Sequence, residues 1–409
     1  MGPRVTIIGA SLAGLRSAEA VLAALPQARI TLIGAEPHLP YNRPPLSKDG
    51  LSALVAAGGD PTDMKAVFCG LTLRHRLPEG AVDWRLGLRA TAVDAARQHV
   101  LLSDGTTLGH DWLIAATGLR PRRLPFEGAD DRRHVLRSFD DATRLAAALR
   151  PGVKLAIIGA GLIGCEMAGT TAALGCKVTL IEPQCQPMLA VLGPRVAAAM
   201  AQLHRARGVD LRCGLSVAGL LPDGLRLSDD SRVEADVILE SAGSLPNVDW
   251  LSGTGIDLSD GILCDNTLSA IGNDRILAVG DVARFPNPLF GGSPRRVEHW
   301  GMAGLTARRA AETIAAREAG RAPGTTFAPL PGFWSDQHGL RLQGFGIPTI
   351  ADETRLIEGD LAMPGTTPCI VEYRRDGRAV AVLGIAAPPA AMAAHRARLE
   401  RALSETVPA

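Results

Sequence analysis

The sequence predicts an α/β fold in which two Rossmann-like dinucleotide-binding units are followed by a small α+β unit. Three observations lead to this prediction. A chain of 409 residues is longer than the chains that usually fold around a single hydrophobic core. The order apolar strand, glycine-containing turn, helix, apolar strand and acidic residue occurs twice. The final stretch has strand-like runs (CIVEY, AVAVLGI) and no third glycine fingerprint, which predicts a small mixed sheet with a C-terminal helix.

The first unit runs from the strand-like VTIIG through the turn GASLAG and the helix-like LAGLRSAEAVLAAL to ITLIG and Glu36. Such a turn cradles a dinucleotide pyrophosphate at a helix N-terminus, and the acid accepts hydrogen bonds from ribose hydroxyls. The third turn position, usually glycine, is Ser11, a small residue whose hydroxyl can bond a phosphate oxygen. The alternative is a tight turn within a parallel sheet. The predicted contacts from this turn are Gly9, Ser11, Leu12, Ala13 and Gly14.

The second unit repeats the pattern as LAIIG, AGLIGCEMAGTTAALG and KVTLI, and it has all three glycines of the fingerprint. The predicted contacts are Gly159, Gly161, Leu162, Ile163 and Gly164. Glu182 ends the second strand, and no arginine follows it closely to hold a 2′-phosphate, so the sequence favours NADH over NADPH. Arg195 lies several residues further on and moderates this preference.

Composition excludes several classes of protein. The formal net charge is +1 with no basic block, which argues against nucleic-acid binding. No apolar run approaches the roughly 20 residues of a membrane helix, and the strand-like start leaves no room for a signal peptide, so we expect no membrane association and a cytoplasmic enzyme. The 7 cysteines are scattered without metal-ligand spacing, and we expect reduced, mostly buried thiols and no metal site.

Two later motifs complete the pattern. LIAATGLRPRR ends a strand at Thr117 and Gly118, as a crossover between two nucleotide units does, and RILAVGDVARF places Gly280 and Asp281 after an apolar strand, where a carboxylate can bond a polyol chain. With these motifs, nearly the whole chain resembles the two-dinucleotide flavoproteins built like glutathione reductase. The resemblance implies that GASLAG cradles the FAD pyrophosphate, that GAGLIG serves the nicotinamide nucleotide, and that Asp281 contacts the flavin.

Three further segments indicate a branch of that family. The stretches YNRPPLSK, RRVEHWGMAG and GFWSDQHGLRLQGFG resemble the single-component ferredoxin reductases of Rieske dioxygenases and bacterial haem monooxygenases. The redox cysteine pair and His-Pro motif of the disulfide reductases are absent from the sequence. Asn42 and Ser11 depart from the usual aspartate and glycine. The resemblance implies that FAD takes hydride from NADH and passes single electrons to an iron–sulfur ferredoxin.

The resemblance also implies residue roles, each with a simpler alternative. Lys48, aimed by the stiff Arg-Pro-Pro-Leu-Ser segment, is placed beside the flavin and paired with Glu166; a solvated lysine and a helix-dipole carboxylate are the alternatives. Trp300 borders the flavin and nicotinamide, unless it is a core residue. Further candidates for cofactor contact are Arg43, Arg122, Gly243, Glu298, His299 and Trp334, for which ion pairing or packing is the alternative.

The resemblance implies a discontinuous FAD domain, 1–121 and 242–318, an NAD domain, 122–241, and a C-terminal α+β domain, 319–409. A helix is predicted over 306–317, and its basic residues suggest a docking patch for an acidic ferredoxin. That patch comprises Arg295, Arg296, Arg308 and Arg309, with a solvated helix face as the alternative. We expect a monomer or weak homodimer. The alternative functions are an NADH oxidase or quinone-type reductase, and a non-catalytic flavoprotein of the apoptosis-inducing-factor kind.

Overall fold

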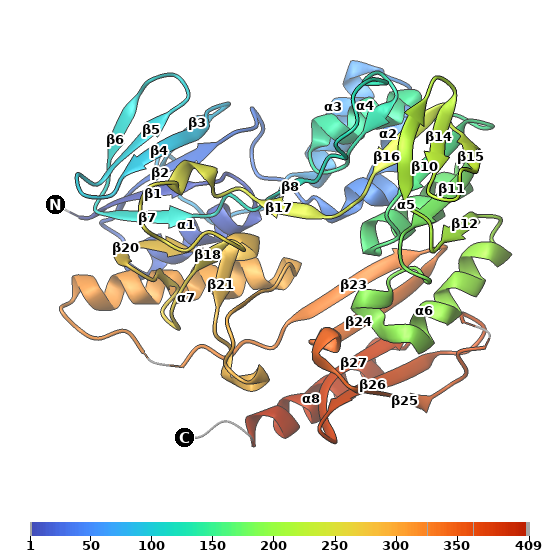
Figure 1. The fold of residues 1–409 in the computed structure, drawn as a ribbon. Helices are drawn as coiled ribbons and strands as arrows, with labels where there is room; N and C mark the ends of the chain where they lie inside the picture. Colours follow the sequence, from blue (N-terminus) through green and yellow to red (C-terminus); the bar gives the residue numbers. More distant parts are fainter. Residues whose placement is uncertain (1, 325, 363, 406–409) are drawn as a thin grey trace.

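The computed structural model describes residues 2–324, 326–362 and 364–405, and it confirms the predicted α/β class. Two largely parallel sheets each carry one of the glycine turns, and a third sheet follows near the C-terminus (Figure 1). The first sheet has six strands in the order β19 (Ser269–Ala270), β20 (Asn273–Ala278), β7 (Trp112–Ala115), β1 (Arg4–Ile8), β2 (Arg29–Gly34) and β3 (Val82–Leu86). Only β19 and β20 pair antiparallel in this sheet.

Alternation along β1 explains the layers around the first sheet. Val5 and Ile7 pack with apolar residues of α1 (Leu12–Ala24) and α7 (Trp300–Glu318), whereas Ile8 belongs to the core on the opposite face. That face is covered by β4 (Ala90–Asp94), β5 (His99–Leu102) and β6 (Thr107–Gly109), whose Val100 and Leu102 are buried there. A small sheet of β18 (Ile262–Leu263), β21 (Ala283–Phe285) and β22 (Arg295–Arg296) lies on the same side.

The second sheet has the order β12 (Asp210–Cys213), β11 (Lys177–Glu182), β10 (Lys154–Ile158), β16 (Val237–Glu240) and β9 (Arg133–His134), all parallel. Leu155 and Ile157 face a core shared with α4 (Phe139–Ala148), α5 (Leu162–Ala173) and α6 (Leu189–Ala206). Ala156 and Ile158 face β13 (Val217–Leu221), β14 (Gly224–Leu227) and β15 (Arg232–Glu234) instead. Both glycine turns therefore follow a strand buried on both faces.

The two halves are joined by a ribbon and by a segment that crosses over. The ribbon pairs β8 (Leu119–Pro121) antiparallel with β17 (Ser244–Pro246) and passes between the halves in Figure 1. The crossing segment holds the 3-10 helix η1 (Pro44–Ser47), α2 (Asp49–Ala57) and α3 (Pro61–Leu71), and α2 packs against α4 of the second half. The division into domains at 121, 241 and 318 stays a prediction.

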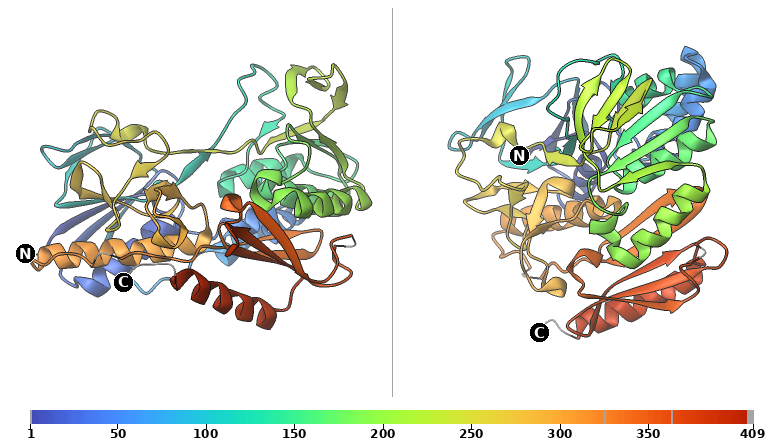
Figure 2. Two further views of the ribbon diagram at one scale, coloured as in Figure 1. Left: turned by 60° about the horizontal axis from the view of Figure 1, so that its bottom comes forward. Right: turned by 45° about the vertical axis from the view of Figure 1, so that its right-hand side comes forward.

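The C-terminal sheet corrects one expectation, because it is antiparallel throughout and not mixed. Its order is β23 (Gly332–Gln337), β24 (Leu340–Gly346), β27 (Arg378–Ile385), β26 (Cys369–Arg375) and β25 (Glu353–Glu358). Two-residue hairpin turns join β23 to β24 and β26 to β27, and hairpins impose antiparallel pairing. One face packs on the core shared with α5 and α6, and α8 (Pro389–Ser404) covers the other (Figure 2).

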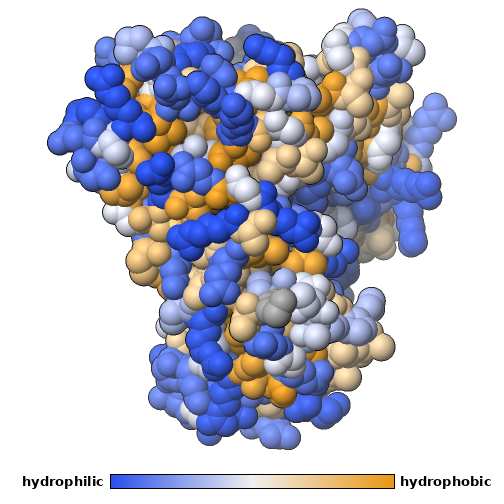
Figure 3. Space-filling model, turned by 90° about the vertical axis from the view of Figure 1, so that its right-hand side faces the viewer, coloured by the Kyte–Doolittle hydropathy of each residue, from blue (hydrophilic) through white to orange (hydrophobic). Residues whose placement is uncertain are grey.

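Hydrophilic residues cover much of the surface that faces the viewer in Figure 3, with apolar residues between them. Among the described residues, no helix has the length and apolarity required to cross a bilayer. The 7 cysteines, all described, are free thiols, and four of them are buried, in agreement with the sequence-based expectation.

Candidate functional site

The first glycine turn is shaped by backbone contacts at two of its positions. Gly9 has φ +120°, and a Cβ there would lie 2.2 Å from the carbonyl oxygen of Ala116. A Cβ at Gly14 would lie 1.9 Å from the carbonyl oxygen of Gly9. Ser11 is the N-cap of α1, and its hydroxyl accepts a hydrogen bond from Arg43 rather than capping the helix. The first backbone N–H groups of α1, at Leu12 and Ala13, therefore remain available to an anion within the described part of the chain.

At the second turn, the glycines that the fold requires can be distinguished from the glycine that a ligand would require. Cβ atoms at Gly159 and Gly164 would lie 2.3 Å and 1.9 Å from backbone oxygens of Ser241 and Gly159. Gly161, in contrast, has φ −73°, and a Cβ there would meet open space. The fold itself gives no reason for glycine at position 161, whereas a phosphate approaching the start of α5 would need that space. Leu162 and the 46% exposed Ile163 begin the helix there.

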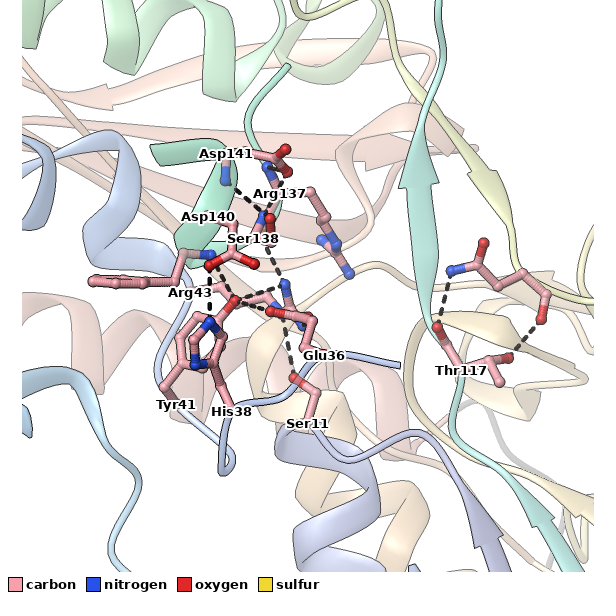
Figure 4. A network of polar contacts seen from close by, with 12 residues as sticks. Ser11, Glu36, His38, Tyr41, Arg43, Thr117, Arg137, Ser138, Asp140 and Asp141 are labelled. Atoms are coloured by element: carbon pink, nitrogen blue, oxygen red, sulfur yellow. Dashed lines mark hydrogen bonds and ion pairs between the residues drawn. The ribbon is translucent and has the colours of Figure 1, made fainter. Parts of the chain in front are cut away.

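The two predicted acids lie at equivalent places, each at or just beyond the carboxyl end of the second strand of its unit. Glu182 accepts hydrogen bonds from the backbone N–H groups of Ala160 (2.7 Å) and Gln184 (3.0 Å). Glu36 accepts from the hydroxyl of Tyr41 (2.6 Å) and the guanidinium of Arg43 (2.5 Å), as Figure 4 shows. An ionised carboxylate has about four acceptor positions, so each acid retains capacity for ribose hydroxyls.

A second arginine, Arg137, lies beside Arg43 near the first glycine turn, and the sequence analysis did not identify it. Arg137 lies beside Arg43, whose guanidinium donates to the carbonyl oxygen of Arg137 at 2.7 Å. Its own guanidinium lies 3.4 Å from the carboxylate of Asp281. Burial and the neighbouring charge of Arg43 lower the pKa of Arg137. Two guanidinium groups gathered near a glycine turn fit a ligand with two negative charges, such as a pyrophosphate. No motif surrounds Arg137 in the sequence, so only the fold identifies it.

The two late motifs join distant parts of the chain. The hydroxyl of Thr117 donates to the carbonyl oxygen of Asn247 (2.6 Å), and the Asn247 amide donates to the carbonyl oxygen of Thr117 (3.0 Å; Figure 4). Gly118 (φ +60°) and Gly243 (φ +91°) each directly precede a strand of the ribbon and have positive φ angles. Arg122, just after β8, is exposed.

Gly280 begins the 3-10 helix η3 (Gly280–Val282) and brings the last of these motifs to the first turn. A Cβ at Gly280, which has φ +66°, would lie 2.9 Å from the Cβ of Ala13. The motif that ends at Asp281 therefore lies against the N-terminus of α1.

The ion pair implied by the resemblance is present. Lys48 Nζ lies 2.6 Å from Glu166 Oε2, and the two side chains are only 15% and 6% exposed. Glu166 also accepts from the hydroxyls of Ser47 (2.5 Å) and Ser335 (2.7 Å) and from the backbone N–H of Asp336 (3.3 Å). Sequence reasoning missed both serines. With four donors, the buried carboxylate is fully hydrogen-bonded, as a charge in this position requires.

The aromatic candidates lie near one another. The rings of Trp300 and Trp334 are 5.9 Å apart, and the Trp300 indole N–H donates to Asn42 at 3.0 Å. Trp300 is 44% exposed, which argues against the alternative of a core residue.

Burial lowers the pKa of His299 to about 4, and its buried Nδ1 has no partner among the described residues. Glu298 pairs with Arg296 at 2.8 Å.

The predicted docking patch needs one correction. Arg309 is only 6% exposed and donates to the carbonyl oxygens of Asn266 and Gly324, so it belongs to the interior and not to a surface patch. Adjacent helix positions differ by about 100°, and Arg308 is accordingly exposed. Arg295 is partly exposed, whereas the Arg296 side chain is only 12% exposed and pairs with Asp260 at 2.7 Å. Within the described ranges, no cluster of residues could hold a metal ion.

Comparison with known proteins decides the family. Residues 3–307 match the family model described as pyridine nucleotide-disulphide oxidoreductase, and residues 332–406 match the one described as reductase C-terminal. The chain belongs to the pyridine nucleotide-disulphide oxidoreductase family. The resemblance inferred from the sequence motifs is thereby confirmed.

Relatives within this family have similar length. The chain is 36% identical over 360 residues to the p-cumate 2,3-dioxygenase system ferredoxin–NAD(+) reductase component of Pseudomonas putida, which covers 87% of this chain and 84% of that protein. It is 33% identical over 391 residues to putidaredoxin reductase of Pseudomonas putida, with 92% and 87% covered. The crystal structure of the covalent putidaredoxin reductase–putidaredoxin complex matches with a TM-score of 0.86 at 30% identity, covering 98% of this chain and 93% of that one.

Proposed function

We propose that this chain is an FAD-dependent NADH:ferredoxin reductase that passes single electrons to an iron–sulfur ferredoxin serving an oxygenase. The observation that carries the proposal is the buried Lys48–Glu166 pair, which links the segment after the first acid to the helix of the second glycine turn. Relatives named as ferredoxin–NAD(+) reductase components of dioxygenase systems support it.

FAD belongs at the first turn. The N–H groups at the start of α1, with Arg43 and Arg137, are suited to hold its pyrophosphate. Glu36 is placed to accept the adenosine ribose hydroxyls, and Asp281 the ribityl hydroxyls. The buried Nδ1 of His299, unpartnered among the described residues, is a further polar atom that a bound group can satisfy. When bound, FAD supplies a ring that accepts a hydride and returns electrons one at a time.

NADH belongs at the second turn. Gly161 leaves room for its pyrophosphate, and Glu182, held by two backbone N–H groups, is oriented to accept ribose hydroxyls and to repel a 2′-phosphate. Arg195 does not offset this preference, because its guanidinium donates to the carbonyl oxygen of Thr354. Lys48 supplies a positive charge in a water-poor site, and Glu166 fixes the direction of that charge.

Electrons leave towards a ferredoxin docked on the basic surface of Arg295 and the exposed Arg308, whereas the charge of Arg296 is already compensated by Asp260 and Glu298. Opposite charge on the partner would speed the encounter more than it would tighten the complex. A monomer or weak homodimer in the cytoplasm is part of this proposal.

Anaerobic rapid mixing tests the proposal. The FAD-loaded protein is reduced with NADH and then mixed with an iron–sulfur ferredoxin, with oxygen or with a quinone. We expect reoxidation by ferredoxin to be at least about tenfold faster than by either alternative acceptor. Faster reoxidation by oxygen or quinone would assign the chain to the oxidase or quinone-reductase class, and slow reoxidation by all three would favour a non-catalytic flavoprotein.

A further inference from the structure

Glu166 is connected to two histidines through a continuous series of buried side chains. Ser335 Oγ lies 2.7 Å from Glu166 Oε1, and Gln337 Nε2 lies 3.0 Å from Ser335 Oγ. Gln337 Oε1 lies 3.1 Å from His204 Nε2, and His204 Nδ1 lies 2.9 Å from His338 Nε2. We call Ser335, Gln337, His204 and His338 the His–Gln–Ser network.

The fold places these residues together for simple reasons. Ser335 and Gln337 alternate along β23 with the half-exposed Trp334 and Asp336, so both point into the interface with α5 and α6. Ser335, Gln337 and His204 are fully buried. On α5, a Cβ at Gly169 would lie 2.9 Å from the backbone nitrogen of His338, so glycine at 169 permits the β23–β24 turn to approach the helix.

The chemistry of the donors fixes the direction of every hydrogen bond. The ionised Glu166 only accepts, so Ser335 must donate to it and can then accept from the Gln337 amide N–H. Gln337 Nε2 donates its second hydrogen to the sulfur of Met188, with the nitrogen and sulfur 3.2 Å apart, which leaves Gln337 Oε1 as an acceptor. His204 must therefore carry its proton on Nε2. Its Nδ1 then accepts from Nε2–H of His338.

The state of His204 agrees with this order. Burial, with a smaller effect of His338, lowers the pKa of His204 to about 4, which keeps the ring neutral and its Nδ1 available as an acceptor. Burial also lowers the pKa of His338. Consecutive hydrogen bonds that point the same way polarise one another, so the whole series strengthens the bond that reaches Glu166.

We propose that Gln337 and His204 are positioning residues, which act through Ser335 to hold Glu166 in the orientation that directs Lys48. The C-terminal sheet thereby sets the electrostatics of the nicotinamide site, with His338 as the outermost member of the network. The inference deepens the proposed function and rests on it, because it concerns the same ion pair. An amide in the middle of the series makes it a positioning device and not a path for protons.

Two variants of the FAD-loaded enzyme test the network by anaerobic rapid mixing with NADH. Gln337→Met keeps the length of the side chain and removes its amide, and His204→Phe keeps a ring without its donor. We expect each to slow flavin reduction at saturating NADH about 3- to 10-fold, with the dissociation constant of NADH changed less than about twofold. Gln202→Met, on the exposed face of α6, is the matched control and should leave the rate unchanged.

A double variant separates positioning from simple structural damage. If Gln337 acts through Ser335, then Gln337→Met should cause little additional loss in a Ser335→Ala background. An undiminished loss there would overturn the proposal, and so would wild-type rates for both single variants. Imidazole ¹⁵N NMR of the holoenzyme supplies a readout other than activity: we expect Nε2–H tautomers at both histidines, and an Nδ1–H tautomer at His204 contradicts the network.

Glu166→Gln distinguishes the role of the Lys48–Glu166 ion pair from the role of the His–Gln–Ser network. A wild-type rate of flavin reduction in Glu166→Gln would contradict the proposed role of the ion pair itself. A large loss in Glu166→Gln, together with unaffected Gln337→Met and His204→Phe variants, would contradict the network alone.

Discussion

Lys48 and Glu166 stand 118 positions apart in the sequence, yet their Nζ and Oε2 atoms lie 2.6 Å apart in a largely buried ion pair. The proline-stiffened η1 helix delivers the lysine, and the first turns of α5 deliver the glutamate. The pair therefore forms only when the crossing segment packs against the second half of the molecule.

Replacing Lys48 tests whether its charge matters. A cation facing developing negative charge in a water-poor site contributes about 2–4 kcal/mol, so Lys48→Met, which retains most of the length, should slow flavin reduction by NADH about 30- to 1000-fold. Rapid mixing of the FAD-saturated variant with NADH measures this rate. Lys65→Met, at an exposed position of α3, is the matched control. A wild-type rate in Lys48→Met would return Lys48 to the role of a surface residue.

The second glycine turn should separate folding from binding. Gly164→Ala places a Cβ 1.9 Å from a backbone oxygen and should lower the free energy of unfolding by about 1–3 kcal/mol. Gly161→Ala meets open space, so its unfolding midpoint should hardly change while KM for NADH rises about tenfold. Denaturation and steady-state kinetics measure the two effects. Equal loss of stability in both variants would contradict the assignment of position 161 to the ligand.

The parts of this site that were predictable from sequence are local ones. Each glycine turn is set by strand, turn and helix within a short stretch, so Gly9, Gly14, Gly159 and Gly164 could be inferred directly. The Lys48–Glu166 contact came only from family resemblance, because nothing in either segment encodes the other.

Arg137 and Ser335 could not be inferred at all. Their positions depend on how β9 and β23 pack. Arg137 stands in no motif, and Ser335 lies in the segment GFWSDQHGLRLQGFG, which the resemblance identified without assigning this serine a role. The prediction that Arg309 belongs to a surface patch was wrong, because the sequence shows a basic helix but not which of its faces the fold buries.

Glu182 should set the nucleotide preference. Its carboxylate repels a 2′-phosphate, whereas the neutral side chain introduced by Glu182→Gln would not, although its amide oxygen can still accept a backbone N–H. The ratio of kcat/KM for NADH to that for NADPH should fall about tenfold in this variant, a change worth about 1.4 kcal/mol. An unchanged ratio would show that another residue distinguishes the two nucleotides.

His110 should contribute to acid lability far from the site. Burial lowers its pKa from 6.5 to about 4, and its Nδ1 is buried without a partner among the described residues. The unfolded chain therefore binds a proton at His110 more readily than the folded chain does. Above pH 6.5 this difference has no effect on the free energy of unfolding, and as the pH falls from 6.5 towards 4 it lowers that free energy by at most about 3 kcal/mol. His110→Phe should lose less stability between about pH 7 and pH 5, as urea denaturation measures. His75→Phe, at an exposed position, should retain the wild-type pH dependence.

The two neighbouring arginines of α7 should respond differently. Arg308 is exposed, so Arg308→Glu should raise KM for an acidic ferredoxin about tenfold at low salt, with the difference shrinking as salt screens the charges. Reduction of ferricyanide by NADH should stay unchanged, because a small acceptor does not need the docking surface. Arg309 is buried and bonds two backbone carbonyls, so Arg309→Met should lower the unfolding midpoint without raising KM for ferredoxin. Steady-state titrations with ferredoxin at two ionic strengths measure both variants. If Arg308→Glu left KM unchanged at low salt, the docking surface would have to lie on another face of the molecule.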